Sequence, residues 1–153
     1  MVVKTLHIIS STVLFGFGAG TAWYFWNAHL TREPALIASV GRMVVKADWI
    51  FTGTSGVVQP VSGLWLVYHS GHTLTEPWLL VSYVLYITAF LCWAPVVRLQ
   101  IKAQRLAEEA QDIHQPLGSD YERVMLQWFA LGWPAFLGLV TVFWLMTSKP
   151  LLW

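Results

Sequence analysis

Four long apolar runs separated by short polar stretches dominate the chain, and they cover residues 6–28, 47–68, 78–97 and 121–147. At a rise of about 1.5 Å per residue, each run is long enough to cross a hydrocarbon core of about 30 Å as a helix. We therefore predict an all-α protein, a transmembrane four-helix bundle that forms a single domain over residues 1–153.

The run at 6–28 also fits the pattern of a secretory signal peptide. In that interpretation Lys4 is the charged start and the small residues at 19–22 are the cleavage site. The run is longer than the apolar part of a signal peptide and it ends in aromatic residues, among them Trp23 and Trp26. We therefore expect it to remain as the first helix.

Two partly polar stretches adjoin these runs. Residues 35–46 either lie along the membrane interface or extend the second helix. Residues 98–114 are charged and helix-prone, so they are expected to form a short solvated extension between the third and fourth helices. The second helix is the most polar of the four and should face protein, and Pro60 within it predicts a kink.

The positive charges fall unevenly on the two sides of an antiparallel arrangement. Seven of the nine Lys and Arg residues share one side: Arg32, Arg42, Lys46, Arg98, Lys102, Arg105 and Arg123. Only Lys4 and Lys149 lie on the other. By the positive-inside rule the larger group is cytoplasmic, which makes the extension cytoplasmic and both termini periplasmic. This predicts a multi-pass protein of the bacterial cell inner membrane.

Composition narrows the function classes. The chain is 56% hydrophobic and 11% charged, with a formal net charge of +1, so it lacks the basic surface that nucleic acid requires. Its single cysteine, Cys92, excludes a disulfide within the chain. The sequence contains no Gly-x-Ser-x-Gly, no paired carboxylates within an apolar run and no His-Glu-x-x-His, so a hydrolase has no motif here.

Three of the five histidines are predicted to meet at the outer boundary. His7 opens the first helix, His69 closes the second, and His72 follows three residues later. Haem iron takes two axial ligands, so we predict haem b held by His7 with His69 or His72. The same three residues could instead hold copper or zinc. In a third interpretation, His7 and His69 are interfacial residues and ligate nothing.

One face of the first helix fits a flat cofactor, because His7, Ser11 and Gly18 share a sector of its surface. Gly18 leaves room for a ring edge, and Trp65 on the second helix is expected at the edge of the pocket. The opposite face carries Gly16 and Gly20, a GxxxG pair that could pack against another subunit or a larger complex.

His29 lies 22 residues after His7 and belongs to the inner side of the membrane. A second haem there would need a partner, and Met125 at the start of the fourth helix is the candidate that the topology places nearby. His114 falls in the solvated connection and is expected to serve no site.

Several short motifs resemble a bacterial family of small predicted integral membrane proteins of unknown function. They are the opening Lys4-Thr-Leu-His7-Ile-Ile, Gln59-Pro60 with Gly63, and the closing segment from Pro134 to Lys149-Pro150. More distantly, the layout resembles the HemJ-type protoporphyrinogen oxidase, a four-helix haem b protein of the membrane.

The HemJ-type resemblance implies that His7 matches the histidine of that family's first helix and binds haem b. We therefore expect electron transfer near the periplasmic face, with a quinone or a periplasmic redox protein as partner. Two alternatives stay open: a HemJ-like, haem-dependent porphyrinogen oxidase, and an accessory subunit of a membrane complex without a cofactor.

Overall fold

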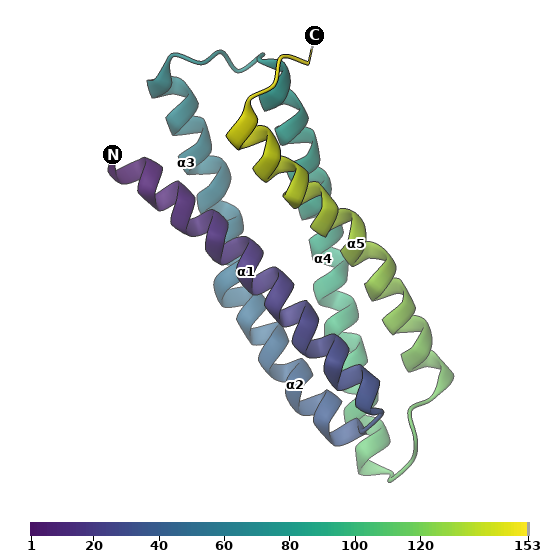
Figure 1. Ribbon diagram of the computed structural model, residues 1–153. Helices are drawn as coiled ribbons and strands as arrows, with labels where there is room; N and C mark the ends of the chain where they lie inside the picture. Colours follow the sequence, from purple (N-terminus) through teal and green to yellow (C-terminus); the bar gives the residue numbers. More distant parts are fainter. Residues whose placement is uncertain (153) are drawn as a thin grey trace.

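The computed structural model describes residues 1–152, and its regular structure is helical throughout (Figure 1). In chain order the elements are α1 (Val2–Thr31), α2 (Pro34–Ala47), the π-helical segment η1 (Asp48–Gly53), α3 (Thr54–Ser70), α4 (Pro77–Asp112) and α5 (Ser119–Ser148). The predicted all-α class is confirmed, and each predicted helix lies within an observed helical segment.

The helix ends have local causes. Pro34 and Pro77 stand in the first turn of α2 and α4, where the missing backbone N–H costs nothing and the fixed φ favours a helix. Gly71, with a φ of 75°, ends α3 in the left-handed conformation that glycine adopts without strain.

The elements α2, η1 and α3 run end to end. Asp48 and Thr54, at the two junctions, both keep right-handed helical dihedral angles, so residues 34–70 form one continuous helical rod. Of the two alternatives for residues 35–46, the structure therefore shows the extension of the second helix. The sequence predicted a kink at Pro60, which lies inside α3. The α-helical pattern is instead interrupted earlier in the chain, at η1.

Three helices, α1, α4 and α5, are long and apolar enough to cross a membrane. The 17-residue α3 is not among them, although it continues from η1. The structure thus supports three candidate crossings among the described residues, while the fourth crossing and the orientation of the termini stay predictions.

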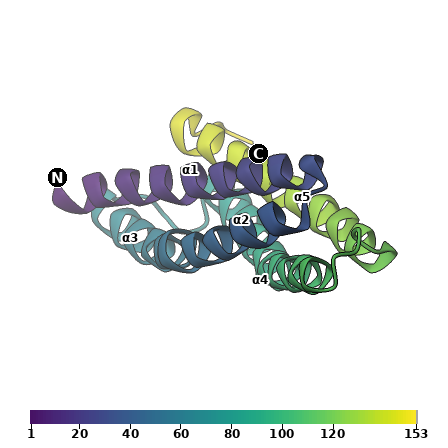
Figure 2. The ribbon, with the colours of Figure 1, turned by 90° about the horizontal axis from the view of Figure 1, so that it is seen from below.

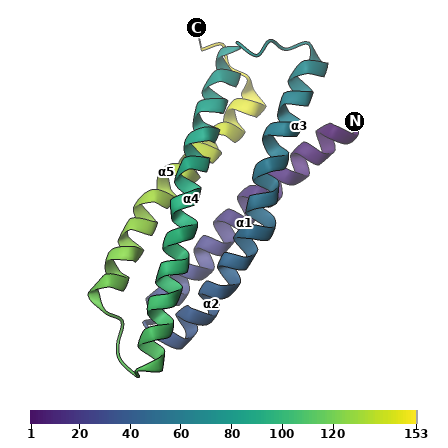
Figure 3. The same cartoon turned by 180° about the vertical axis from the view of Figure 1, so that it is seen from behind.

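The helices form two pairs, α1 beside the α2–α3 rod and α4 beside α5 (Figures 1 and 2). The pairs meet through α2 and α4 at the end of the molecule where α1 passes into α2 (Figure 3). Both chain termini lie at the opposite end (Figure 1). An even number of crossings would bring the termini to one side in this way.

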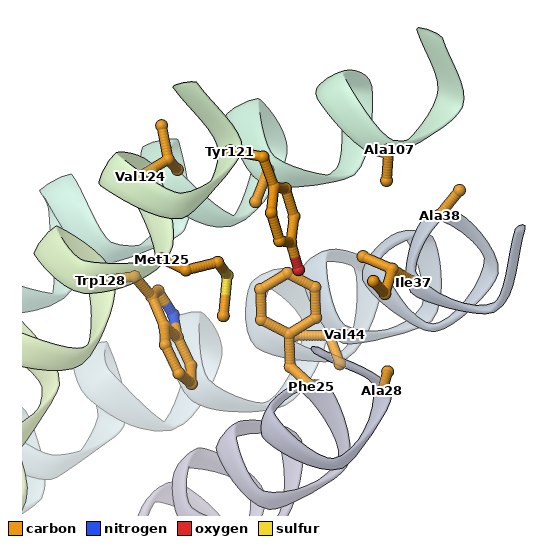
Figure 4. Close-up of a cluster of buried hydrophobic side chains, with 11 residues drawn as sticks. Phe25, Ala28, Ile37, Ala38, Val44, Ala107, Tyr121, Val124, Met125 and Trp128 are labelled. Carbon is orange, nitrogen blue, oxygen red and sulfur yellow. The ribbon is translucent and has the colours of Figure 1, made fainter. Parts of the chain in front are cut away.

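The main hydrophobic core lies where the two pairs meet (Figure 4). Phe25 packs edge-on against Trp128 with ring centroids 5.4 Å apart, and Ile37, Tyr121 and Met125 are almost fully buried beside them. Alanines on α1, α2 and α4 let the helix backbones approach closely: Ala28, Ala38, Ala103 and Ala107.

Candidate functional site

A cavity of about 590 Å³ lies between α1, η1, α4 and α5. Its walls are mainly aromatic, and the rings come from α1, α4 and α5: Phe15, Trp23, Trp26, Tyr86, Phe90, Trp93, Trp128, Phe129, Trp133 and Phe136. Small-molecule sites are concave, mostly apolar and about 300–1,000 Å³ in volume. This cavity matches that description.

Glycines widen the cavity. A Cβ atom built on Gly18 or Gly132 would meet no atom within 4 Å, so both positions border open space. The sequence analysis assigned Gly18 to a cofactor pocket, and Gly18 does line this cavity. The cavity is not the predicted pocket, however, because His7, His69 and His72 do not line it.

Several aromatic side chains of the cavity wall are also exposed on the outside of the protein. Trp23 is 65% exposed, Phe90 49% and Trp133 48%. All three belong to helices that are apolar enough to span a membrane, so hydrocarbon is their natural surroundings. A ligand dissolved in the bilayer would meet these rings first.

One carboxyl group, that of Asp48, lines the cavity. Its Oδ1 atom accepts hydrogen bonds from the hydroxyls of Thr21 and Thr52, each at 3.1 Å, and the Gln100 side chain is a further hydrogen-bond donor to this carboxyl group. Asp48 and Thr52 both belong to η1, and π-helical turns occur frequently at functional sites.

Four buried side-chain polar atoms of residues 1–152 have no hydrogen-bond partner. They are Tyr83 Oη, Trp93 Nε1, Gln100 Oε1 and Trp128 Nε1. The last three belong to residues that line the cavity. Because an unpaired buried polar atom costs about 1–3 kcal/mol, three such atoms in residues of one cavity wall mark it as a candidate binding site.

His7 lies against the second helix, as the predicted topology requires. Its Nδ1 is 2.8 Å from Ser62 Oγ. Gly63 packs closely beside it, because a Cβ added there would lie 3.2 Å from the imidazole ring and the ring would have to shift. When the Ser62 hydroxyl donates to the Val58 carbonyl, at 2.6 Å, it accepts from His7 Nδ1–H. The other ring nitrogen, Nε2, is then unprotonated.

The other two histidines of the predicted site make separate contacts. The ring of His69 stacks on Trp65 at 3.7 Å between centroids, and His69 Nδ1 bonds the Trp65 carbonyl. His72 Nδ1 is 3.0 Å from the carboxylate of Glu76, and its Nε2 is 3.2 Å from Lys149 Nζ.

Within residues 1–152, no three His, Cys, Asp or Glu side chains are grouped so that they could hold a metal ion. The structure therefore does not bring His7, His69 and His72 together as one metal site. Haem, which needs two axial ligands, is not tested by this finding, and its ligation stays a prediction.

The remaining predicted residues have simple surroundings. Ser11 Oγ donates to the Ile8 carbonyl within α1. Gly16 and Gly20 border open space, so that face of α1 is free for another subunit, which the structure does not test. Inside the bundle, His29 bonds the Tyr121 hydroxyl at 3.1 Å, and Met125 is packed in the hydrophobic core.

The sequence analysis missed Gln100, Trp93 and Trp128 as site residues. Gln100 stands in a stretch predicted to be solvated, yet its side chain is 2% exposed. A signal was present in the sequence, because Gln100 begins a row of positions, continued by Ala103, Ala107 and Ala110, at the three- and four-residue spacing of a buried helix face.

Comparison with known proteins gives one match. Residues 1–150 match the family described as "Predicted integral membrane protein (DUF2269)". No curated protein and no solved structure matches the chain.

Proposed function

Because the chain belongs to the DUF2269 family of predicted integral membrane proteins, we propose that it acts within the bilayer by binding a flat, largely apolar molecule. The observation that carries this proposal is the aromatic cavity between α1, η1, α4 and α5. Its volume of about 590 Å³ suits a fused-ring or substituted-ring compound.

The walls of the cavity explain why a flat molecule fits best. Aromatic faces favour offset stacking or edge contacts with another ring, which adds to the gain from burying apolar area. Glycine at positions 18 and 132 leaves the wall without side chains at two places, where the edge of a ring can lie. The exposed rings of Trp23, Phe90 and Trp133 support an entrance on the lipid side.

Anthracene, a flat apolar fluorophore, tests the proposal. It accepts energy from tryptophan, so its emission on tryptophan excitation reports binding to the purified protein in detergent micelles. We expect saturable binding that Gly132→Leu weakens at least tenfold, since the new side chain would fill open space in the cavity.

Ala130→Leu is the matched control, because it adds the same side chain two residues away, on the exposed surface of α5 and outside this cavity. It should bind anthracene like the unaltered protein. Equal weakening by both substitutions, or emission that rises linearly with anthracene concentration, would reject the cavity as the binding site.

A second candidate function is electron transfer through haem b at His7, with a quinone or a periplasmic redox protein as partner. Its support is the hydrogen bond from His7 Nδ1–H to Ser62, because histidines that ligate metals usually donate their other ring N–H in this way. The residue fits an axial ligand through Nε2, and haem iron would supply reversible one-electron transfer. His69 or His72 is the proposed second ligand.

A further inference from the structure

The three unpaired polar atoms at the cavity limit the chemistry of its occupant. Trp93 Nε1 and Trp128 Nε1 are hydrogen-bond donors only, whereas Gln100 Oε1 is an acceptor. Each has almost no accessible area, so neither water nor an occupant of the cavity reaches it until its side chain turns. By contrast, the hydroxyl of Tyr86, which also lines the cavity, already donates to the Gly56 carbonyl at 2.6 Å.

From this set of atoms, and resting on the proposed function, we infer that the occupant is a quinone. A quinone is a flat ring with two carbonyl oxygens, and these accept hydrogen bonds from the two indole N–H groups. Its reduced form carries hydroxyls, which donate to Gln100 Oε1 or to the carboxyl group of Asp48. The same residues can therefore hold both forms.

Binding in this way requires the side chains of Trp93, Trp128 and Gln100 to turn, because their unpaired atoms have almost no accessible area on the cavity wall as it stands. Trp93 is only partly buried, although it contacts Trp49 and Phe90. Trp128 is 5% exposed and makes an edge contact with Phe25. We therefore assign the larger adjustment to Trp93. A hydrocarbon tail on the quinone would leave between the exposed rings of Trp23, Phe90 and Trp133 into lipid.

Two other occupants explain the polar atoms less well. A lipid acyl chain would fill the apolar volume but offer no acceptor to the indoles. Haem would need an axial ligand, and the described lining of this cavity includes no His, Cys or Met, while its one tyrosine, Tyr86, donates its hydroxyl to Gly56. The haem proposed at His7 would belong to a different place, the contact of α1 with α3.

The test compares two competitors of equal shape, 1,4-naphthoquinone and naphthalene, for their ability to displace anthracene. We expect the quinone to displace half of the anthracene at about a tenfold lower concentration, the effect of one or two net hydrogen bonds. Trp93→Phe should reduce this preference to threefold or less, and Trp128→Phe should do the same.

Trp144→Phe is the control, because Trp144 is an exposed tryptophan of α5 outside the cavity. It should keep the tenfold preference. If the buried Trp128 cannot be replaced without loss of the fold, the unaltered protein and Trp93→Phe decide the matter.

The outcomes separate this inference from the proposed function. Displacement by both competitors at the same concentration would overturn the quinone while leaving the cavity as a binding site. A full quinone preference in Trp93→Phe would overturn the assigned hydrogen bonds. If anthracene itself does not bind, the proposed function fails first.

Discussion

At the residue scale, His7 shows how one hydrogen bond fixes the chemistry of a side chain. The Ser62 hydroxyl has one hydrogen, and when it donates this hydrogen to Val58 it accepts from His7 Nδ1–H. The lone pair of His7 is therefore on Nε2. A neutral imidazole in this form can ligate iron.

If haem b is bound, the purified protein should show a Soret band, and His7→Ala should abolish it or shift it toward a high-spin spectrum because one axial ligand is lost. His114→Ala is the control, because His114 lies in the connection between α4 and α5. A colourless unaltered protein would reject the haem proposal, and an unchanged spectrum in His7→Ala would reject that ligand.

Single residues of the cavity were only partly predictable. Asp48 and Thr52 stood out in the sequence, because polar residues inside an apolar run are expected to face protein. Trp93 and Trp128 did not, since tryptophan near a helix end is equally typical of the membrane interface. Whether an indole N–H meets water, protein or a cavity depends on residues far away in the chain.

At the scale of elements, two ion pairs connect helices beside the main core. Arg32, which directly follows α1, pairs with Glu122 of α5, and Arg42 of α2 pairs with Glu108 of α4. The hydrogen bond from Arg42, and secondly that from Gln104, lowers the pKa of Glu108 below its ordinary value of 4.5. Since these side chains are partly exposed, each pair stabilises the fold by at most about 1 kcal/mol.

The pair of Arg42 and Glu108 makes a pH-dependent contribution. A carboxyl group whose pKa is lowered on folding stabilises the protein fully above its unfolded pKa and loses that contribution as pH falls through the folded pKa. We expect Glu108→Gln to lower the free energy of unfolding at pH 7 by up to about 1 kcal/mol. The difference from the unaltered protein should shrink as the pH falls below 4.5.

Thermal or denaturant unfolding in detergent, followed by circular dichroism at pH 7 and pH 4, measures this effect. Glu109→Gln is the matched control, because Glu109 is the exposed neighbouring residue and forms no ion pair within residues 1–152. A Glu108→Gln effect that is equal at both pH values would show that the ion pair is not its cause.

The sequence predicted the helices, but it did not predict the π-helical turn within the second of them. Apolar runs predicted the helices, and Pro34 and Pro77 explain two of the starts. The π-helical turn at Asp48–Gly53 was not predicted, because it changes the hydrogen-bond register without a proline at that place. Its polar side chains gain partners from α1 and α4, so tertiary contacts stabilise it.

At the scale of the whole molecule, the membrane topology can be tested by cysteine labelling. In a Cys92→Ser background, we expect Val2→Cys and Thr73→Cys to react with a membrane-impermeant maleimide applied to spheroplasts. Gln111→Cys should react only after permeabilisation, because four crossings place the end of α4 in the cytoplasm. All three positions are exposed on the protein.

The pattern of labelling distinguishes three crossings from four. If the rod of α2, η1 and α3 stays on one side, Val2→Cys and Thr73→Cys will lie on opposite sides of the membrane. The Cys92→Ser protein without an added cysteine is the control and should remain unlabelled. If only Gln111→Cys is labelled, the protein has four crossings in the orientation opposite to the predicted one.

The sequence by itself determined that this chain is helical and belongs in a membrane, because the length and apolarity of a run are local properties that suffice for a spanning helix. It predicted that His7 lies beside His69 and His72, since antiparallel neighbours bring their ends together, whereas the structure places His7 against Ser62 and Gly63. Only the tertiary structure showed the aromatic cavity and its unpaired polar atoms. A cavity is the space left between four packed elements, and its volume depends on how their side chains meet.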